Sequence, residues 1–414
     1  MIYLIGGIAL SGNKGASGMA EALIQNLRKR DSEAKFRLLS YYPVQDRKLP
    51  RSGDPVELLD GSPGKLVLLF FLSLWAELGR KLRLPRTWYV HGEMAKIAEC
   101  GCWLDASGIS FADGREKFLI FNILSVFPAL ALRIPVVKVA QAMGPFEHRI
   151  NRLAAKWVLP RLRLIVARGA TTRAGLDTLG LANVIDGADI AFSLRTNPTD
   201  RMRIAEFLPP PGRRVIGVSP SQVVWKLCEK RKIPYLETLR RGVTAWTDAG
   251  MDCIVFPHSA RQGCLQTHNN DLPLLNRFAG MLPESEHIRI VKAELSAGEL
   301  RMLIGACDLL VASRFHAIIS AMATGVPAVV IGWSHKYAEA LAPFELDGFV
   351  IPYSELDEEE VQRRVAEIFA HREELSARIR RTSAGIVAEN ERFFDRIAAG
   401  VGGGVISSSK PAED

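Results

Sequence analysis

The sequence predicts an α/β protein made of two Rossmann-like, doubly wound domains that face a central cleft. Short apolar runs of strand length alternate with amphipathic segments of helix length through both halves of the chain. The 414 residues exceed the size of one ordinary domain. Three consecutive prolines at residues 209–211 interrupt the chain near its middle, and because they can continue neither a helix nor a central strand, they predict a linker.

The first half opens with an apolar run, Ile2–Ile8, that predicts a strand. A small polar turn at residues 13–18 follows, and Met19–Arg30 then has apolar residues at helical spacing and a basic run suited to a helix C-terminus. Further strands are predicted at Phe36–Ser40, Val136–Ala140 and Ile165–Ala167. These elements predict an N-terminal domain over residues 1–207.

The second half repeats this alternation after a linker at residues 208–213. Strands are predicted at Val215–Val218, Cys253–Phe256, Ile288–Val291, Leu309–Ala312 and Ala328–Ile331. A helix is predicted at Glu358–Ala370, and this helix and the charged segment after it are expected to pack back across the first domain. We therefore expect a C-terminal domain over residues 214–385, then a C-terminal helix and a tail of flexible composition over residues 386–414.

The charge of the chain is uneven. The formal net charge is +8, and residues 1–197 contain 27 Lys and Arg against 17 Asp and Glu. A basic N-terminal half suits an anionic membrane surface or an acidic, phosphorylated acceptor. Nucleic acid would also suit this charge, but the sequence has no zinc finger, ribonucleoprotein signature or basic-aromatic pattern, so we expect no nucleic-acid partner.

Cysteine usage and the N-terminus indicate a cytoplasmic protein. Six cysteines are scattered along the chain, and only Cys100 and Cys102 lie close together, which favours free thiols over a zinc site or disulfides. The first seven residues are apolar without a basic segment before them, so they predict a strand and not a signal peptide.

The most hydrophobic stretch is Leu66–Ala76, which is shorter than the roughly 20 residues that a membrane-spanning helix needs. Four basic residues follow it, Arg80, Lys81, Arg83 and Arg86. One interpretation is a buried packing helix. The other is a peripheral membrane contact through residues 65–86, with an apolar body and a basic edge at the lipid interface.

The most informative segment is residues 311–333. An apolar strand is followed at once by Arg314, Phe315 and His316, then by a segment of helical composition and a second apolar run. In open parallel sheets, ligands bind just outside the carboxyl ends of the strands. Arg314 has no carboxylate beside it in the sequence, so we expect it to pair with an anionic ligand while His316 supplies a titratable group.

This segment resembles the signature of the polysaccharide pyruvyl transferase family, in which Arg-x-His-Ala follows one strand and Gly-x-Pro precedes the next. Further matching segments are Asn13-Lys14-Gly15, Asp105-Ala106-Ser107-Gly108, Gln141 with the Gly-Pro-Phe after it, Arg168, Pro257-His258 and the loop that contains Lys336. The chain departs from the family where relatives have Asp and Glu, because Ala16 and Gly169 stand at those positions. The resemblance covers roughly residues 1–370.

The resemblance implies a GT-B-like fold and transfer of the pyruvyl group from phosphoenolpyruvate to a sugar, as a cyclic ketal, without a metal or other cofactor. It implies that His316 and Asp105 are catalytic, His316 moving protons and Asp105 orienting or deprotonating the acceptor hydroxyl. Donor-binding residues would be Arg314, Phe315, Arg168, Lys336 and His258. Other cleft residues would be Asn13, Gly15, Ser107, Gly108 and Gln141. The acceptor would be a polysaccharide sugar or its lipid-linked precursor.

Local alternatives remain open for several of these residues. Asn13 and Gly15 also suit a tight turn that opens a helix, and Asp105 with Ser107 suits a capped loop. His258 could be a satisfied structural histidine, and Lys336 a solvated loop residue.

Two other functions remain as alternatives for the whole chain. A nucleotide-sugar glycosyltransferase would share the fold, although residues 314–336 contain no Asp or Glu to bind a ribose. A non-catalytic relative that only binds or organises polysaccharide would not need Arg and His together at a strand end.

Overall fold

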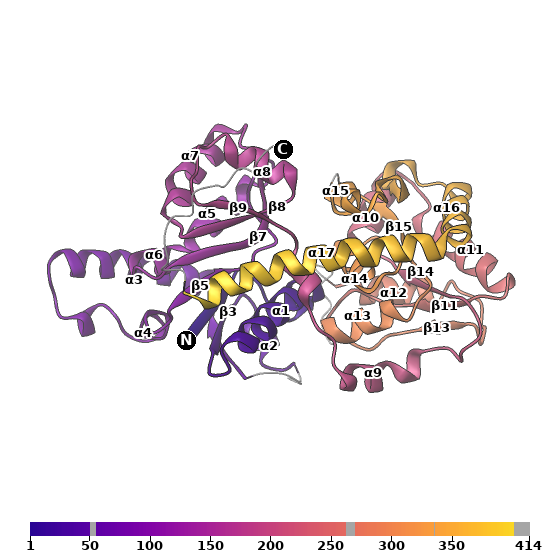
Figure 1. Ribbon diagram of the computed structural model, residues 1–414, viewed down its shortest axis with the longest axis horizontal. Helices are drawn as coiled ribbons and strands as arrows, with labels where there is room; N and C mark the ends of the chain where they lie inside the picture. The colour runs from indigo at the N-terminus through magenta and orange to yellow at the C-terminus, as the bar shows by residue number, and fades with distance from the viewer. Residues whose placement is uncertain (50–54, 262–269, 335, 401–414) are drawn as a thin grey trace, which may run out of the picture.

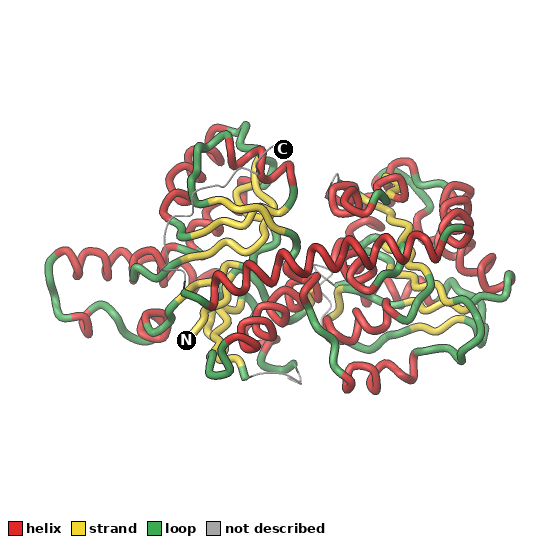
Figure 2. The backbone as a smooth tube through the Cα atoms, in the orientation of Figure 1, coloured by secondary structure: helices red, strands yellow, loops and turns green. Residues whose placement is uncertain are grey.

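The computed structural model describes residues 1–49, 55–261, 270–334 and 336–400 and has two parallel sheets side by side, each covered by helices (Figure 1, Figure 2). The first sheet has the order β4-β3-β1-β5-β7-β8-β9, with β6 paired to β7. Its strands are β1 (Ile2–Gly6), β3 (Lys35–Ser40), β4 (Val56–Asp60), β5 (Cys102–Asp105), β6 (Ile109–Ala112), β7 (Val136–Gly144), β8 (Leu164–Arg168) and β9 (Val184–Gly187).

The second sheet has the order β13-β11-β10-β14-β15-β16, and all its neighbours are parallel. Its strands are β10 (Val215–Ser219), β11 (Asp252–Val255), β13 (Ile288–Ile290), β14 (Leu309–Ala312), β15 (Ala328–Gly332) and β16 (Val350–Pro352). The central strands are buried along their whole length, which is why they read as continuous apolar runs in the sequence.

Helices connect the strands in both halves. In the N-terminal half they are α1 (Lys14–Arg30), α2 (Pro43–Asp46), α3 (Pro63–Lys81), α4 (Glu93–Ala98), α5 (Leu119–Leu124), α6 (Phe127–Ala131), α7 (Arg149–Val158) and α8 (Ala170–Asp177). Later in the chain come α9 (Pro198–Ile204), α10 (Gln222–Lys230), α11 (Tyr235–Asp248), α12 (Leu272–Ala279), α13 (Ala297–Gly305), α14 (Phe315–Thr324), α15 (Lys336–Leu341), α16 (Glu358–Ala370) and α17 (Arg372–Ala398).

The chain crosses between the sheets earlier than the prolines predict. Helix α9 packs on α13 of the second half, where Arg203 pairs with Glu299 at 2.9 Å. The prolines at 209–211 therefore lie after this crossing, between α9 and β10. The tail of flexible composition that the sequence predicts lies, from residue 401 to 414, outside the described residues.

Helix α17 is longer than predicted and lies across both halves (Figure 1). It begins at Arg372 and not at 386. Near its C-terminus Arg30 of α1 pairs with Glu391 at 2.6 Å and with Asp395 at 2.7 Å. Earlier in the helix, the hydroxyl of Ser383 donates to the carbonyl oxygen of Met322 in α14. The expectation that this charged segment packs back across the first domain is confirmed, but the same expectation for α16 is wrong, because α16 packs on α11 and β15 of the second half.

A small antiparallel sheet also joins the halves. Strand β2 (Gly12–Asn13), just after β1, pairs with β12 (Ser259–Ala260), just after β11. Nearby, the ammonium of Lys14 pairs with Glu294 at 2.8 Å, and Lys14 is buried. The loops that follow the carboxyl ends of strands in one half thus contact the corresponding loops of the other half.

Candidate functional site

Both sheets reverse their strand order at a point that carries predicted site residues. In the second sheet β10 is flanked by β11 and β14, which lead toward opposite edges, and Arg314 follows β14. In the first sheet β1 is flanked by β3 and β5, and Asp105 ends β5. Ligands of open α/β sheets bind at such switch points, outside the carboxyl ends of the strands.

Arg314 has a carboxylate partner that its sequence neighbourhood does not reveal. Its Nε lies 2.8 Å and its Nη2 2.5 Å from the two carboxylate oxygens of Asp271, which is fully buried. Asp271 also accepts backbone N–H groups of Gln222 and Ser259. The inference that Arg314 lacks a protein partner is therefore wrong, and the pair fixes the orientation of the guanidinium by two parallel bonds.

Phe315 is the centre of a group of cations. The guanidinium carbon of Arg168, at the end of β8, lies 5.2 Å from the centre of the Phe315 ring, and the Lys336 ammonium lies 5.2 Å from the same centre. The ammonium of Lys336 is also 4.7 Å from the ring of Trp333 and 5.2 Å from that of Tyr337. Aromatic faces attract cations, so these rings hold positive charge beside the first turn of α14.

The amino end of α14 contributes to the same region. Arg314 is the residue before the helix, and Phe315 and His316 form its first turn. No side chain caps this helix end. The first N–H groups of a helix are unpaired within it and its dipole favours negative charge, so this end adds to the positive potential made by the cations.

His316 lies between the two halves. A Cβ added to Gly15 of α1 would lie only 2.0 Å from the imidazole Cγ, so the absence of a side chain at Gly15 gives the ring its place. The Nε2 atom is 3.7 Å from a carboxylate oxygen of Asp189, too far for a hydrogen bond. Within the described residues this buried Nε2 has no hydrogen-bond partner, which leaves it available to a ligand.

Burial and the neighbouring cations favour the neutral forms of two groups. Burial lowers the pKa of His316 to about 4, with the charges of Arg168 and Lys336 acting in the same direction against Asp189. Burial, with Arg168 and Arg115, lowers the pKa of Lys336 to about 7. A bound anion would oppose both effects.

Other predicted donor residues lie against this group in different ways. His258, after β11, is buried, and its pKa is held well below the ordinary value by burial and then by His316 and Arg314. His258 thus lies close enough to His316 for a charge on one imidazole to lower the pKa of the other. Arg168 is paired with Asp189 at 2.8 Å, so both Arg168 and Arg314 are oriented by carboxylates.

Asp105 belongs to a second, buried group. Its carboxylate pairs with Lys138 of β7 at 2.6 Å and accepts the Ser107 hydroxyl at 2.6 Å. Gln141 donates to the same carboxylate at 3.0 Å and to the Asp105 carbonyl oxygen at 2.7 Å. Burial raises the pKa of Asp105, but Lys138 and Ser107 outweigh it, so the pKa stays below its ordinary value. The carboxylate is thus ionised, and its contacts orient Lys138, Ser107 and Gln141.

The geometry changes the expected roles of several cleft residues. Gln141 and Asp105 are fully buried, whereas Ser107 and Gly108 are the partly exposed residues of this group. Asn13 accepts the N–H of Gly15 at 3.2 Å and caps α1, as its structural alternative predicts.

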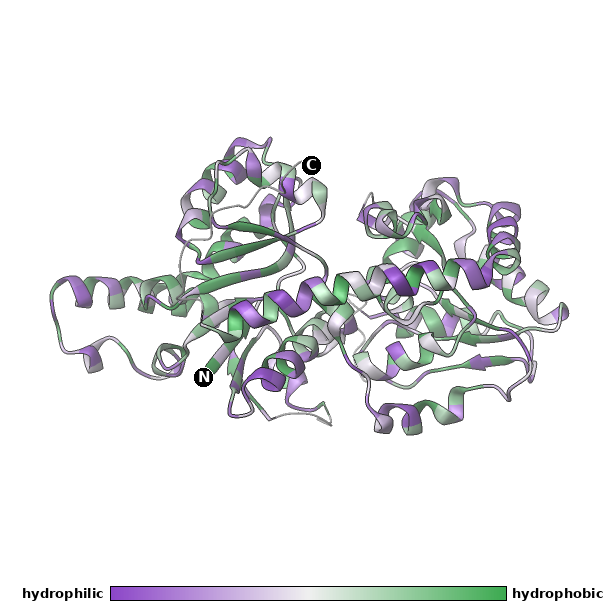
Figure 3. Ribbon diagram, viewed as in Figure 1, coloured by the Kyte–Doolittle hydropathy of each residue, from purple (hydrophilic) through white to green (hydrophobic). Residues whose placement is uncertain are grey.

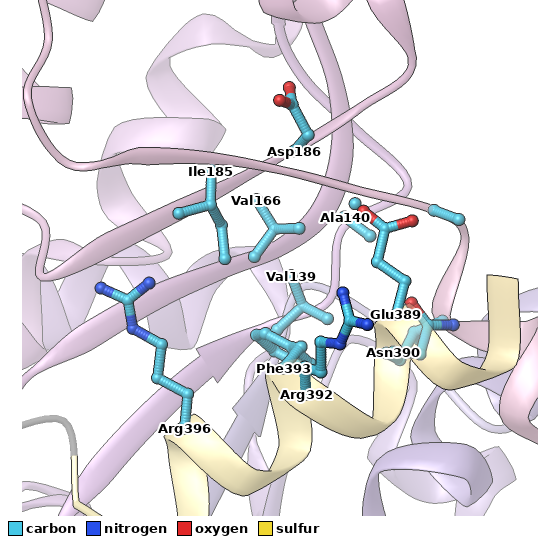
Figure 4. A pocket seen from close by; sticks show the side chains of 13 residues that line it. Val139, Ala140, Val166, Ile185, Asp186, Glu389, Asn390, Arg392, Phe393 and Arg396 are labelled. Carbon is cyan, nitrogen blue, oxygen red and sulfur yellow. The ribbon is translucent and has the colours of Figure 1, made fainter. Parts of the chain in front are cut away.

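Two further features lie apart from these groups. Among the described residues, Asp113, Glu116 and His148 could approach a metal ion, since their ligand atoms lie within 4.8 Å of one another, but they are exposed or half-buried and already bond to one another and to backbone groups. A hollow between the first sheet and α17 is lined by residues such as Val139, Ile185 and Phe393 (Figure 4). None of the predicted site residues lines it.

Sequence reasoning missed Lys138 and the aromatic partners of Lys336. Lys138 is a charged residue within an apolar strand, and a buried charge requires a partner, so its position was a usable signal. Trp333 and Tyr337 flank Lys336 in the sequence, and this aromatic spacing was also visible there. The pairing of Asp271 with Arg314, 43 residues apart, had no such local signal.

Comparison with models of known protein families shows which family the chain belongs to. The family model described as polysaccharide pyruvyl transferase matches residues 13–335. The chain belongs to this family. All predicted site residues except Lys336 lie within the matched span. The amylovoran biosynthesis protein AmsJ of Erwinia amylovora is 24% identical over 435 aligned positions, which cover 97% of this chain and 99% of AmsJ.

Solved structures confirm the GT-B-like fold of this family member. The UDP-GlcNAc 2-epimerase of Neisseria meningitidis, solved with UDP-GlcNAc, has a TM-score of 0.59 at 10% identity and covers 96% of this chain and 100% of its own. MnaA of S. aureus, solved with UDP, has a TM-score of 0.58 at 12% identity, with coverages of 100% and 99%. At such identities the likeness concerns the fold alone.

Proposed function

We propose that this chain transfers the pyruvyl group of phosphoenolpyruvate to a sugar of a cell-surface polysaccharide, or of its lipid-linked precursor, and forms a cyclic pyruvate ketal. The observation that carries the proposal is the group of cations around Phe315 at the amino end of α14. Family membership and the AmsJ relative, named for biosynthesis of the polysaccharide amylovoran, support the substrate class.

The donor would bind as an anion with two charged ends. Phosphoenolpyruvate has a carboxylate and a phosphate on one three-carbon unit, and Arg314 and Arg168 are suited to such groups because their guanidinium forks are planar and held by Asp271 and Asp189. Lys336, as a compact charge, would neutralise the phosphate. The N–H groups at the start of α14 would add hydrogen-bond donors.

His316 would move the protons of the reaction. The C3 carbon of the donor takes up a proton, C2 develops positive charge, and an acceptor hydroxyl attacks C2. The C2–O bond to phosphate breaks, and a second hydroxyl of the same sugar closes the ketal. Two hydroxyl protons leave, one compensating the proton gained by C3 and the other ending on phosphate. His316 is neutral near pH 7 and its Nε2 has no hydrogen-bond partner among the described residues, so it can accept the proton of the attacking hydroxyl and deliver it to C3.

Asp105 would act on the acceptor through Ser107. Because the carboxylate is buried and bonded to Lys138, direct proton abstraction from a sugar is disfavoured, and orientation of the partly exposed Ser107 hydroxyl is the role that its contacts support. The acceptor would then approach from the switch point of the first sheet, and the donor from that of the second.

Calorimetric titration with phosphoenolpyruvate and, separately, with UDP-GlcNAc tests the donor. We expect phosphoenolpyruvate to bind without added metal, and the Arg314→Lys variant to weaken binding by about 10- to 100-fold, since Lys keeps the charge but loses the bidentate fork. Arg173→Lys, at an exposed ion pair, is the matched control and should bind as the unaltered chain does. Binding of UDP-GlcNAc but not phosphoenolpyruvate would refute the proposal and favour a nucleotide-sugar enzyme.

Turnover separates the catalytic role of His316 from donor binding. With a pyruvylatable glycan as acceptor, His316→Gln should retain phosphoenolpyruvate binding within a few-fold and lose about 100- to 10,000-fold in kcat, the range for a general acid–base group. Retained turnover in this variant would contradict the proton-transfer role.

A further inference from the structure

The exposed apolar side chains of the N-terminal half are concentrated on neighbouring helices. On α7, Ile150, Leu153 and Trp157 follow one another at helical spacing, and Ile150 and Leu153 are 68% and 69% exposed. The residues that α7 buries are Asn151, Ala155 and Val158. The apolar stripe of this helix therefore points away from the core, the reverse of the usual arrangement for a surface helix.

Helix α3 also exposes apolar side chains on the side that faces away from the core. Its inner face buries Leu66, Leu69 and Ala76. On the outside, Val67, Phe71 and Leu74 are 45%, 61% and 43% exposed, at positions that share one side of a helix. Figure 3 shows α3 projecting from the N-terminal half with hydrophobic colouring along much of its length.

Aromatic contacts connect α3 to α7 through α6. The ring of Phe70 on α3 lies 4.8 Å from that of Phe127 on α6, and Phe127 in turn stacks on Trp157 of α7 at 6.1 Å. Phe70 also contacts the ring of Phe71 at 5.7 Å, so the chain of rings connects the exposed Phe71 of α3 to the exposed Trp157 of α7. We call this surface the apolar face, and its principal residues are Val67, Phe71, Leu74, Ile150, Leu153 and Trp157.

The charges on the helices that form the apolar face are almost all positive. The exposed basic residues at the end of α3 and along α7 are Lys81, Arg83, Arg86, Arg149, Arg152 and Lys156. Helices α3, α5 and α7 together contain a single acidic residue, Glu77, and it pairs with Arg80 within α3. A second copy of this chain would bring two basic borders together, so charge complementarity favours an anionic partner.

We propose that the apolar face docks on the surface of an anionic lipid bilayer, with Phe71, Leu153 and Trp157 in the interface and the basic residues at the headgroups. An amphipathic helix with Trp and bulky aliphatic residues on one side and Lys and Arg beside them has the composition of an interfacial helix. No helix of the described residues is long and apolar enough to cross a membrane, so the contact is peripheral. The proposal does not depend on the pyruvyl transferase reaction.

Flotation of the full chain with vesicles tests the proposal. We expect binding to phosphatidylcholine vesicles that contain phosphatidylglycerol, and at least tenfold weaker binding to pure phosphatidylcholine, because each basic residue near an anionic surface contributes about fivefold in affinity. Leu153→Glu should weaken binding to the anionic vesicles by at least tenfold. The matched control is Met202→Glu, since Met202 is 76% exposed on α9, remote from the apolar face, and should leave binding unchanged.

The charge and the apolar residues are tested separately. The double variant Arg152→Gln and Lys156→Gln should weaken binding to anionic vesicles by about 10- to 25-fold and leave binding to neutral vesicles unchanged. No binding to anionic vesicles, or binding that both Leu153→Glu and the double variant leave intact, would overturn the proposal. A concentration-dependent dimer that Leu153→Glu abolishes, without vesicle binding, would also overturn it and assign the apolar face to a second copy.

Discussion

Binding of phosphoenolpyruvate at pH 8 is expected to take up about one proton, chiefly on Lys336. With its pKa lowered to about 7, free Lys336 is about one-tenth protonated at this pH. A ligand charge about 4 Å away contributes about 4 kcal/mol at an effective dielectric constant of about 20, which corresponds to roughly three pKa units. The pKa of Lys336 in the complex would then lie well above the pH of the experiment, so its protonation becomes almost complete.

His316 contributes little at this pH. Its pKa starts from about 4, so a rise of the same size leaves most of the imidazole neutral at pH 8, and it adds only about one-tenth of a proton. The donor phosphate, with a second pKa of about 6, is already fully ionised. Because the complex holds the extra proton, the dissociation constant should rise about tenfold per pH unit between pH 7.5 and 9.

The assay is calorimetry at pH 8 in three buffers that differ in ionisation enthalpy: HEPES, EPPS and Tris. The slope of the binding enthalpy against the buffer ionisation enthalpy gives the number of protons taken up on binding. Lys336→Met should reduce the uptake to about one-tenth of a proton and flatten the pH dependence. Lys230→Met, at an exposed position on α10, is the control and should leave both unchanged. Binding with no proton uptake at pH 8, or an uptake that Lys336→Met preserves, would refute the assignment.

Three further predictions concern stability and the contact between the halves. Asp271→Asn should lower the free energy of unfolding in urea by about 3–5 kcal/mol, because it leaves a buried guanidinium uncompensated, whereas Asp186→Asn at an exposed pair should cost less than about 1 kcal/mol. His316 stays neutral to about pH 4 in the folded chain but protonates near pH 6.5 when the chain is unfolded. The free energy of unfolding should therefore fall by about 3 kcal/mol from this group as the pH drops from 6.5 to 4. His316→Gln should remove that part of the loss, as measured by urea titrations at several pH values. Gly15→Ala should displace the imidazole of His316 and reduce kcat by at least about tenfold, while circular dichroism shows that the chain stays folded. In the control Gly64→Ala, the added methyl group meets no neighbour, so full activity should be retained.

The strands that sequence patterns predicted well are those buried on both faces. Leu309–Ala312 was predicted with its observed bounds, and Val215–Val218 to within one residue, because helices cover both sides and every position is apolar. Strand β5 was not predicted, because it ends in the charged Asp105, whose burial depends on Lys138, 33 residues away. Helix α17 was predicted too short because its long charged surface hides the sparse apolar positions that pack on two domains.

The candidate site was predictable where one turn carries the chemistry. Arg314 and His316 follow a recognisable strand and open a helix, so their position at the carboxyl end of a strand followed from local pattern. Their partners did not, because Asp271 and Asp189 approach from other elements and a contact across 43 or more residues leaves no local periodicity. For the same reason the burial of Gln141 could not be read from its polar character.

The contacts around His316 and Phe315 tie the proposed chemistry to the relative position of the two halves. The imidazole lies against Gly15 of the N-terminal half, and Arg168 of the same half lies over the Phe315 ring. A small rotation between the halves would remove Arg168 from the anion site and admit water beside His316, which would raise the imidazole pKa toward its ordinary value. The strand pair β2–β12 and helix α17 oppose that rotation on two sides of the site. The lowered pKa values of His316 and Lys336 are therefore properties of the assembled pair of domains, and neither domain alone would reproduce them.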